Sequence, residues 1–314
     1  MTTHTTLPPE RFEADRPHLR AVAYRMLGSL SEAEDAVQET WLRAAGADVA
    51  AVDNLSGWLT TVVGRICLNM LRSRRTRPEV PLDERPAEPV VGPGDGGDPE
   101  EEALLADAVG VALLVVLDTL APAERLAFVL HDLFAVPFDD IAPLIERTPA
   151  ATRQLTARAR RRVRGGSAPV ADRARRREAV DAFLAATRAG DFEALLALLH
   201  PDVVLTADRF VVPTPQPVTM SGARTVAQSA MAATGRARFT GPALLDGRVG
   251  LVMAPQGRLR VALLFTVTPD GITGIDVVAD RERLDAFEVT VLDAPGDEPP
   301  LPDAGDDDPL AEDA

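Results

Sequence analysis

An acidic, proline- and glycine-rich segment at residues 79–102 constrains the fold of this chain more than any other feature. It lies within the stretch PEVPLDERPAEPVVGPGDGGDPEEE, and residues 81–105 carry a net charge of −7. Such a composition cannot bury enough apolar surface to offset the entropy that is lost on ordering. We therefore predict a linker here, with separately folded units on either side.

The charge of the chain is distributed unevenly. A net charge of −15, if spread evenly, would disfavour a nucleic-acid partner. Residues 106–177 carry +4, however, and the predicted disordered tail 291–314 carries −9. All of the basic residues other than His are arginines, which form strong bidentate contacts with phosphate. Our hypothesis is that the acidic linker or tail competes with DNA for the arginine clusters.

Residues 10–78 are predicted to form an all-helical domain. Apolar residues recur at helical spacing up to Gly28, which ends the first helix. Ser31 and Glu34 are expected to form a capping box for the second helix. A third helix begins near Ser56 and ends in the arginine-rich sequence RSRRTR.

Residues 103–165 are predicted to form a second helical domain containing a helix-turn-helix. The segment LLADAVGVALLVVLDTL is almost wholly apolar and is expected to be buried. Pro122 is expected at the first position of the next helix. Two short helices follow, PFDDIAPLIER and PAATRQLTARARRRV, and the second is preceded by Thr148 as its cap, with Pro149 at its first position.

The second helix of this motif predicts contacts to DNA. Its early turns, where a recognition helix meets base edges, contain Thr152, Arg153, Gln154 and Thr156, and its later turns contain the phosphate-binding candidates Arg158, Arg160 and Arg161. The alternative is a solvated helix whose arginines complement the helix dipole.

A second basic stretch lies at the end of the first domain. Arginines beside an aromatic residue can hold a nucleic-acid backbone while bases stack or unstack. The alternative for Trp58 is a position in the core of the domain. The residues concerned are Trp58, Arg65, Asn69, Arg72, Arg74 and Arg75.

Residues 178–290 are predicted to form an α+β domain after a connector at residues 166–177. A long helix precedes the strand-like runs VVLTAD, VGLVMA, LRVALLFTVT and GITGIDVVA. His200, Asp202, Asp208 and Asp276 are the available acid–base candidates, and HPD at 200–202 is expected to form a helix-ending turn. No metal-ligand spacing, phosphate-binding glycine loop or nucleophile elbow is present. We therefore expect no catalytic residue, metal or cofactor.

Targeting signals are absent from the sequence given. No apolar run approaches the roughly 20 residues of a membrane span, and the N-terminus lacks the pattern of a signal peptide. The single cysteine, Cys67, is expected to be a buried apolar residue. The expected location is the cytoplasm, with no membrane association.

Three stretches resemble the two domains of bacterial extracytoplasmic-function (ECF) sigma factors. They are AYRMLGSLSEAEDAVQETWLRA, GWLTTVVGRICLNMLRSRR and LAPAERLAFVLHDLFAVPFDDIAPLIERTPAATRQLTARARRRV. The resemblance implies that the first domain (10–78, sigma region 2) binds the β′ clamp helices of RNA polymerase and opens the −10 promoter element. It also implies that the second domain (103–165, sigma region 4) reads the −35 element.

The resemblance also implies roles for individual residues. The polymerase-binding candidates are Asp35, Gln38, Glu39 and Trp41, and the basic stretch from Trp58 to Arg75 would meet the −10 strand. Asn69 departs from the family pattern, since the subgroup usually carries Asp there. The C-terminal part is similar to the SnoaL-like (NTF2-like) domain of one subgroup, but that subgroup's WLPEP and DGGG motifs are absent.

The expected fold is therefore multidomain, with two all-α domains followed by an α+β SnoaL-like domain. The expected function is that of a non-enzymatic sigma factor, whose C-terminal domain regulates its activity in cis. The expected partners are RNA polymerase core and promoter DNA, and any small-molecule ligand of the C-terminal domain is unknown. Two alternatives are a helix-turn-helix regulator whose SnoaL-like domain senses a small molecule, and a small-molecule enzyme with a helical appendage.

Overall fold

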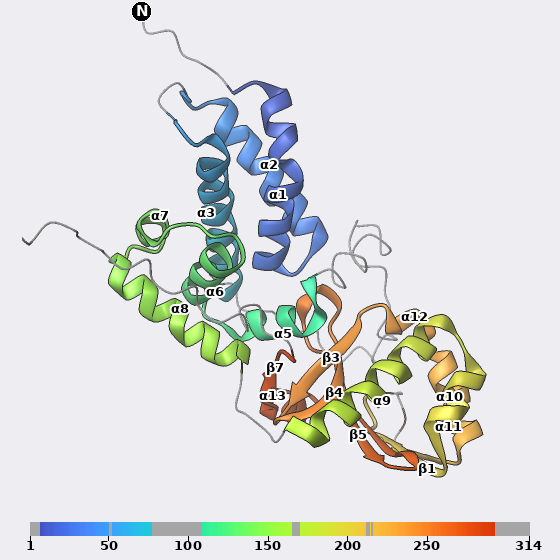
Figure 1. The fold of residues 1–314 in the computed structure, drawn as a ribbon. Coiled ribbons are helices and arrows are strands. Elements are labelled where there is room, and N and C mark those ends of the chain that lie inside the picture. Colours follow the sequence, from blue (N-terminus) through green and yellow to red (C-terminus); the bar gives the residue numbers. More distant parts are fainter. Residues whose placement is uncertain are drawn as a thin grey trace, which may run out of the picture.

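The computed structural model describes residues 7–49, 52–76, 109–164, 170–211, 214 and 216–292. The predicted linker at 79–102 lies outside the described residues, as does the predicted tail except for residues 291 and 292. Figure 1 shows three parts, which we call the first helical domain (7–76), the second helical domain (109–164) and the sheet domain (170–292). The predicted fold class, two helical domains followed by an α+β domain, is confirmed.

The first helical domain packs three helices against one another. These are α1 (Pro9–Leu27), α2 (Leu30–Ala45) and α3 (Leu55–Thr76). Gly28 ends α1 as predicted, because its φ of 76° places it in the left-handed region that favours glycine. The predicted capping box is wrong. Ser29 is the residue before α2, and Glu34 pairs instead with Arg16 and Arg20 of α1.

The second helical domain consists of short helices that lead to one longer helix. Pro122 occupies a first-turn position of α6, as predicted. A π-helical turn, η1, continues α6 directly. The elements are α5 (Val111–Thr119), α6 (Pro122–Phe128), η1 (Val129–Leu133), α7 (Phe138–Ile141), the 3₁₀ turn η2 (Ala142–Ile145) and α8 (Pro149–Arg164).

The sheet domain contains a seven-stranded sheet in the order β2-β1-β6-β5-β4-β3-β7. β1 and β6 are parallel, and the other neighbouring pairs are antiparallel. The strands are β1 (Leu199–Ala207), β2 (Val218–Ser221), β3 (Thr240–Leu245), β4 (Arg248–Met253), β5 (Val261–Thr268), β6 (Gly271–Val278) and β7 (Val289–Thr290). The four predicted strand-like runs correspond to β1, β4, β5 and β6.

Helices of the sheet domain surround this sheet. They are α9 (Val170–Ala189), α10 (Phe192–Leu198), α11 (Ala223–Ala232), α12 (Thr234–Ala237), the 3₁₀ turn η3 (Pro255–Gly257) and α13 (Arg281–Ala286). α9 begins at Val170, so the arginine-rich half of the predicted connector at 166–177 is helical, in keeping with the good helix propensity of arginine. His200 lies in β1, so the predicted helix-ending turn at 200–202 is wrong.

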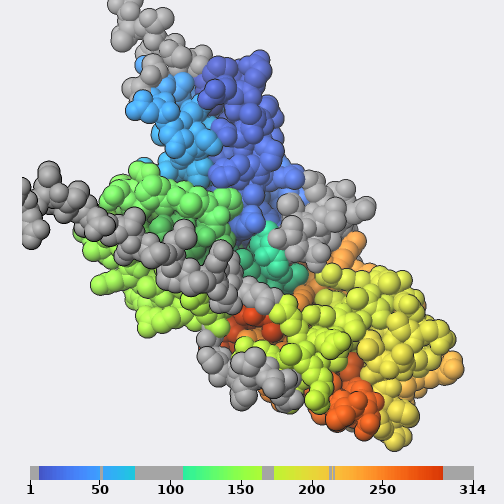
Figure 2. Space-filling view, in the orientation of Figure 1, coloured from blue at the N-terminus to red at the C-terminus, as the bar shows by residue number. Residues whose placement is uncertain are grey.

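Helix α5 joins the three parts. Residues 111–117 are all buried, as expected for a helix that is apolar on every side. It packs on β3, β4 and β7 of the sheet domain and also contacts α1 and α8. Figure 1 shows α5 between the helical domains and the sheet, and in Figure 2 it is visible only where the three parts meet.

Both faces of the sheet are therefore covered where α5 lies. On β4, Val249, Leu251 and Met253 belong to the core shared with the sheet domain's own helices. Val252, on the opposite face, belongs to the same core as α5 and the helical domains. This two-sided burial explains why VGLVM is a continuous apolar run rather than an alternating one.

Candidate nucleic-acid interface

The predicted helix-turn-helix is present in the second helical domain. The Thr148 hydroxyl accepts a hydrogen bond from the Ala151 amide at 3.2 Å, and α8 begins at Pro149. The turn before it contains Glu146 in the left-handed region, at φ 55°, and the Arg147 amide donates to the Ala142 carbonyl at 3.0 Å. The cap and the first helical position are therefore as predicted.

One face of α8 is exposed and polar. Arg153, Gln154, Arg158 and Arg161 are exposed to solvent. The Arg153 guanidinium lies over the Phe138 ring of α7, 5.4 Å from its centroid. This stacking orients Arg153 without removing its donors from solvent. α8 thus presents a basic and amide-bearing surface from its first turns onward.

Thr152 and Thr156 do not belong to that surface. Both are fully buried, on the face of α8 that packs against α6 and α7. Their hydroxyls donate to the backbone carbonyls one turn earlier, at 3.0 Å for Thr152 and 3.2 Å for Thr156. A fully buried side chain cannot reach a base edge. The predicted base contacts of Thr152 and Thr156 are therefore wrong for this conformation.

Carboxylates of the second helical domain hold several arginines of α8. Arg160 forms a two-pronged pair with Asp132 of η1, at 2.5 and 2.7 Å. This hydrogen bonding raises the pKa of Arg160. Arg158 and Arg162 lie 4.0 and 3.5 Å from the Glu124 carboxylate on α6. Arg161 is exposed, and no carboxylate pairs with it among the described residues.

The basic stretch on α3 divides into two groups. Arg65, Asn69 and Arg72 are exposed and lie one helical turn apart, which places them on one stripe. Arg74 is turned inward, where it pairs with Glu32 and donates to the Leu27 carbonyl at 3.4 Å. The predicted contact of Arg74 with the −10 strand stays a prediction, and it would require the guanidinium to leave these partners.

Trp58 and Arg75 are two further residues of α3 for which a DNA contact was predicted. Trp58 is half-buried and packs against the core of the helical domains. Of the two interpretations, this position favours the core one. Arg75 lies within α3, but its side chain is outside the described residues.

The acidic face of α2 is largely available to a partner. Asp35 and Gln38 are exposed, whereas Glu39 is half-buried and paired with Arg43 at 2.9 Å. The Trp41 ring packs against the Phe12 ring of α1, with centroids 5.1 Å apart, so Trp41 contributes to the packing of α2 on α1. Sequence reasoning missed Leu42, which is 61% exposed beside Gln38. An apolar residue on a polar helix face was the available signal.

Three of the four acid–base candidates of the sheet domain, Asp208, Asp276 and His200, have local hydrogen-bond partners. The Asp208 carboxylate accepts from the amides of Ala279 and Asp280, at 2.7 and 2.8 Å. Asp276 pairs with Arg283 at 2.9 Å. The His200 Nδ1 accepts from the Asp202 amide at 3.1 Å. In these hydrogen bonds, no side chain of the four candidates pairs with the side chain of another candidate.

Helices α3 and α8 are packed together through α6. Gly64 of α3 lies against Leu126 and Leu130, where an added Cβ would be 3.1–3.2 Å from their methyl groups. α6 in turn packs on α8. Buried Arg125 of α6 reaches across this contact and donates to the Arg25 carbonyl of α1 at 3.3 Å. The two helical domains therefore share one continuous core.

These features define a protein whose two helical domains carry a helix-turn-helix and a separate exposed basic stripe. Two family models match it: sigma-70 region 2 at residues 11–77 and sigma-70 region 4 at residues 110–163. No described helix is both long and apolar enough to cross a bilayer.

Curated relatives narrow this class. The chain is 44% identical over 200 residues to the ECF RNA polymerase sigma factor SigJ of Mycobacterium tuberculosis, covering 63% of this chain and 64% of that one. It is 38% identical over 193 residues to the probable ECF sigma factor SigI of the same species, covering 61% of this chain and 67% of the relative. The chain belongs to the ECF sigma factor family. The match to SigJ covers 64% of the length of SigJ, which is less than two thirds of that protein.

A solved structure extends the comparison over more of the chain. The crystal structure of Mycobacterium tuberculosis SigJ is 32% identical in sequence, covers 88% of this chain and 98% of that one, and has a TM-score of 0.41.

Proposed function

We propose that this protein is a sigma factor that binds RNA polymerase core and directs promoter-specific initiation without catalysing a reaction itself. The single observation that carries the proposal is the coexistence, in one chain, of an exposed α2 face and an exposed α8 face on the two matched sigma domains. Such an activity on core polymerase would be exercised in the cytoplasm.

The α2 face is the proposed contact to the β′ clamp helices. Asp35, Gln38 and Leu42 are exposed and spaced at three to four residues, so they line one side of the helix. The exposed Leu42 side chain is the proposed anchor of this interface, because burying it on binding removes apolar surface from water. We assign Trp41 to packing rather than contact.

The proposed promoter contacts lie on two helices. On α8, Arg153 and Gln154 are placed to read base edges, and Arg158 and Arg161 to bind phosphates. On α3, the stripe of Arg65, Asn69 and Arg72 is proposed to hold the −10 strand. Asn69 adds an amide where a carboxylate would repel the strand.

The observed arrangement cannot serve both promoter elements at once. α3 packs on α6 and α6 on α8, so the axes of α3 and α8 are about 20 Å apart at 8–10 Å per packed pair. Elements centred near −10 and −35 are separated by about 25 base pairs, or roughly 85 Å of B-DNA at 3.4 Å per base pair. Initiation therefore requires the two helical domains to separate.

The sheet domain is proposed to oppose that separation in cis. It contacts α5 through β3 and β7, and the Val291 amide donates to the Val163 carbonyl at the end of α8, at 3.0 Å. Gly257 of η3 approaches Gly28 of the first helical domain so closely that a Cβ on Gly257 would lie 3.3 Å from the Gly28 Cα. One domain thus touches both of the others.

The polymerase assignment is tested by capture of core polymerase with the full chain. Leu42→Arg places a charge at the centre of the proposed interface and should weaken binding by at least about tenfold, or 1.4 kcal/mol. Phe210→Arg, at another exposed apolar residue, is the matched control. Equal binding by wild type and Leu42→Arg would exclude this face, and no binding by wild type would favour the helix-turn-helix regulator that never joins polymerase.

A further inference from the structure

Three side chains of the second helical domain form a stack that ends at the exposed face of α8. The His131 ring of η1 lies on the Phe138 ring of α7, with centroids 3.8 Å apart and planes inclined by 25°. The Arg153 guanidinium of α8 lies over the same phenyl ring, 5.4 Å from its centroid. Because the imidazole covers one face of the phenyl ring, the guanidinium lies over the other face. We call these three residues the aromatic stack.

The inner end of the aromatic stack is fixed by the backbone. The His131 Nδ1 lies 3.0 Å from the Val136 carbonyl, and since a carbonyl can only accept, Nδ1 carries the proton and donates. The Val136 amide donates in turn to the Leu130 carbonyl at 2.9 Å. The loop between η1 and α7 is thus bonded twice to the π-helical turn, and Phe138 begins α7 directly after this loop. His131 and half-buried Phe138 are therefore held against one another.

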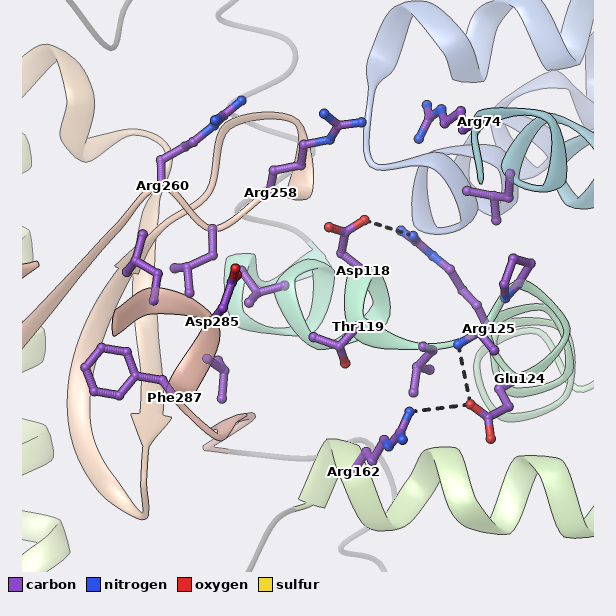
Figure 3. A pocket seen from close by; sticks show the side chains of 18 of the residues that line it. Arg74, Asp118, Thr119, Glu124, Arg125, Arg162, Arg258, Arg260, Asp285 and Phe287 are labelled. Carbon is purple, nitrogen blue, oxygen red and sulfur yellow. Dashed lines mark hydrogen bonds and ion pairs between the residues drawn. The ribbon is translucent and has the colours of Figure 1, made fainter. Parts of the chain in front are cut away.

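Arg153 is held differently from the arginines that follow it on α8. Figure 3 shows Arg162 of α8 reaching the Glu124 carboxylate of α6, and Asp132 pairs in the same way with Arg160. A carboxylate occupies the N–H donors of a guanidinium. Arg153 is exposed, and no carboxylate pairs with it in the part of the chain that the structure describes. A phenyl ring attracts the cation through its face and has no lone pair for the N–H donors, so these stay available.

An arginine whose orientation is already fixed reads a base better than a freely rotating one. A guanidinium contacts guanine through two N–H donors at once, which requires a defined orientation of its plane. A long side chain loses rotamer freedom when it is fixed in this way. Fixing the side chain before DNA binds removes that cost from the binding step. Arg153 lies in the first turns of α8, where a recognition helix meets base edges.

We propose that Phe138 and His131 are positioning residues that set the base preference of Arg153 and thereby the −35 specificity of this protein. Phe138 holds the guanidinium, and His131 holds Phe138 from the opposite face. Neither ring contacts DNA itself. The inference rests on the proposed function, because it concerns how the proposed −35 helix reads one base. That base position should depend on all three residues of the aromatic stack.

The aromatic stack itself is tested by NMR on the full chain without DNA. An aromatic ring shields protons that lie over its face, so the side-chain protons of Arg153 should resonate upfield of those of an exposed arginine. The Arg153→Lys variant assigns the signal by its disappearance. Phe138→Leu should abolish the upfield shift, and Phe138→Tyr, which keeps the ring, should retain it. An Arg153 signal at the same position in wild type and Phe138→Leu would overturn the stack.

The base preference is measured by selection from a library of randomised DNA duplexes, with the full chain and without polymerase. The position that Arg153→Ala no longer specifies is the one that Arg153 reads. Phe138→Leu should reduce the preference at that position about two- to fivefold, the range of an exposed cation–π contact. Non-specific affinity and its salt slope should not change, because the charge is conserved. Phe138→Tyr should restore the preference of wild type.

A matched control is available in the same domain. Phe134, which directly follows η1, also has an arginine over its ring, but this is Arg25 of α1, 5.2 Å from the ring centroid. Phe134→Leu should therefore leave the base preference unchanged. In the Arg153→Ala background, Phe138→Leu should cause no further loss at that position, because the side chain that it positions is absent.

His131→Gln provides a second variant, should Phe138→Leu fail to fold in a thermal melt. It removes the supporting ring and keeps an N–H donor for the Val136 carbonyl. The same base position should lose preference, by less than in Phe138→Leu. An unchanged preference in a folded His131→Gln protein would overturn the role of His131.

The outcomes separate this inference from the proposed function. If wild type selects a sequence and Phe138→Leu selects it with undiminished preference, the positioning role is overturned and the proposed function stands. Equal loss at every position of the site, or the same loss in the Arg153→Ala background, would show a general structural effect and would also overturn the positioning role. If wild type selects no sequence at all, the proposed −35 recognition fails and the positioning role fails with it.

Discussion

Gly241 of β3 lies directly against Val111, the first residue of α5. A Cβ at Gly241 would be 2.9 Å from the Val111 Cβ, closer than real side chains approach. Gly241 thus permits the contact by which the second helical domain rests on the sheet domain. Any side chain at this position must push α5 away from the sheet.

We therefore expect Gly241→Val to loosen the closed arrangement. Overpacking costs about 1–3 kcal/mol, and here the strain can be relieved by separation of the domains. Promoter-DNA affinity of the full chain should rise, as measured by fluorescence anisotropy. Gly235→Val is a control, because no atom lies within 4 Å of a Cβ added at Gly235. Reduced DNA affinity in a folded Gly241→Val protein would contradict restraint in cis.

Point variants test this restraint better than removal of residues 166–314. The truncation exposes the apolar side of α5, whose residues 111–117 are buried partly by the sheet. An exposed apolar surface of that kind promotes aggregation. A loss of activity in the truncated chain would therefore not separate aggregation from the absence of the sheet domain. The Gly241→Val variant avoids this ambiguity because it keeps the full chain.

The division of roles along α8 predicts different losses for two arginines. Arg153→Ala should cost about 1–3 kcal/mol on the preferred −35 sequence and little on others, because base-edge contacts carry the discrimination. Arg161→Ala should weaken binding to all sequences alike and reduce the salt slope by about 1. Anisotropy titrations on matched and scrambled duplexes measure both, and an equal loss of discrimination in the two variants would refute the division.

The buried threonines of α8 provide a second test. Thr152→Val replaces a hydroxyl that donates to the Thr148 carbonyl with a methyl group of similar volume. Because that hydroxyl is buried, sequence discrimination should be unchanged, and the free energy of unfolding should fall by about 1 kcal/mol. Selective loss of discrimination at one base pair would show that Thr152 contacts DNA after all.

The pair between Arg160 and Asp132 limits the charge available to DNA. Asp132→Asn removes the carboxylate, and we expect non-specific DNA affinity to rise and its salt slope to steepen by about 1, because one more arginine reaches phosphate. Asp139→Asn, at an exposed acid on α7, controls for the change in net charge. If both variants raise affinity equally, general electrostatics accounts for the effect.

Cys67 should be unreactive in the folded protein. Burial raises the pKa of its thiol from 9.0 to about 12, so almost no thiolate is present at pH 8. A disulfide reagent should label it only after unfolding. Since the folded pKa is above the unfolded one, this group's contribution to stability is complete below pH 9 and is lost as the pH rises toward 12. Rapid labelling of the native protein at pH 8 would contradict this burial.

Much of the local structure was predictable from the sequence. Gly28, Thr148 and Pro149 mark helix ends by backbone chemistry that depends on few neighbours, and those positions were correct. The apolar run in α5 correctly predicted burial. The apolar run could not identify the elements that cover α5, because an apolar pattern shows only that a helix face is buried. It does not show which part of the chain packs on that face.

The wrong predictions concern residues whose local sequence is compatible with more than one structure. At these positions, contacts with distant parts of the chain decide which structure forms. Glu34 fits a capping box, yet Arg16 and Arg20 of α1 pair with it. Thr152 and Thr156 are polar, yet their hydroxyls are satisfied within α8 and their methyl groups pack inward. β3 was missed because Gly241 and Pro242 interrupt its pattern, although Gly241 is what permits the contact with α5.

Run-off transcription tests the central claim most directly. Core polymerase is combined with the full chain on genomic DNA fragments, with wild type, Gly241→Val and Leu42→Arg compared. The account predicts chain-dependent transcripts from shared −35 and −10 elements, more of them with Gly241→Val and few with Leu42→Arg. Transcription no greater than that of core alone with both wild type and Gly241→Val would contradict the assignment as a sigma factor.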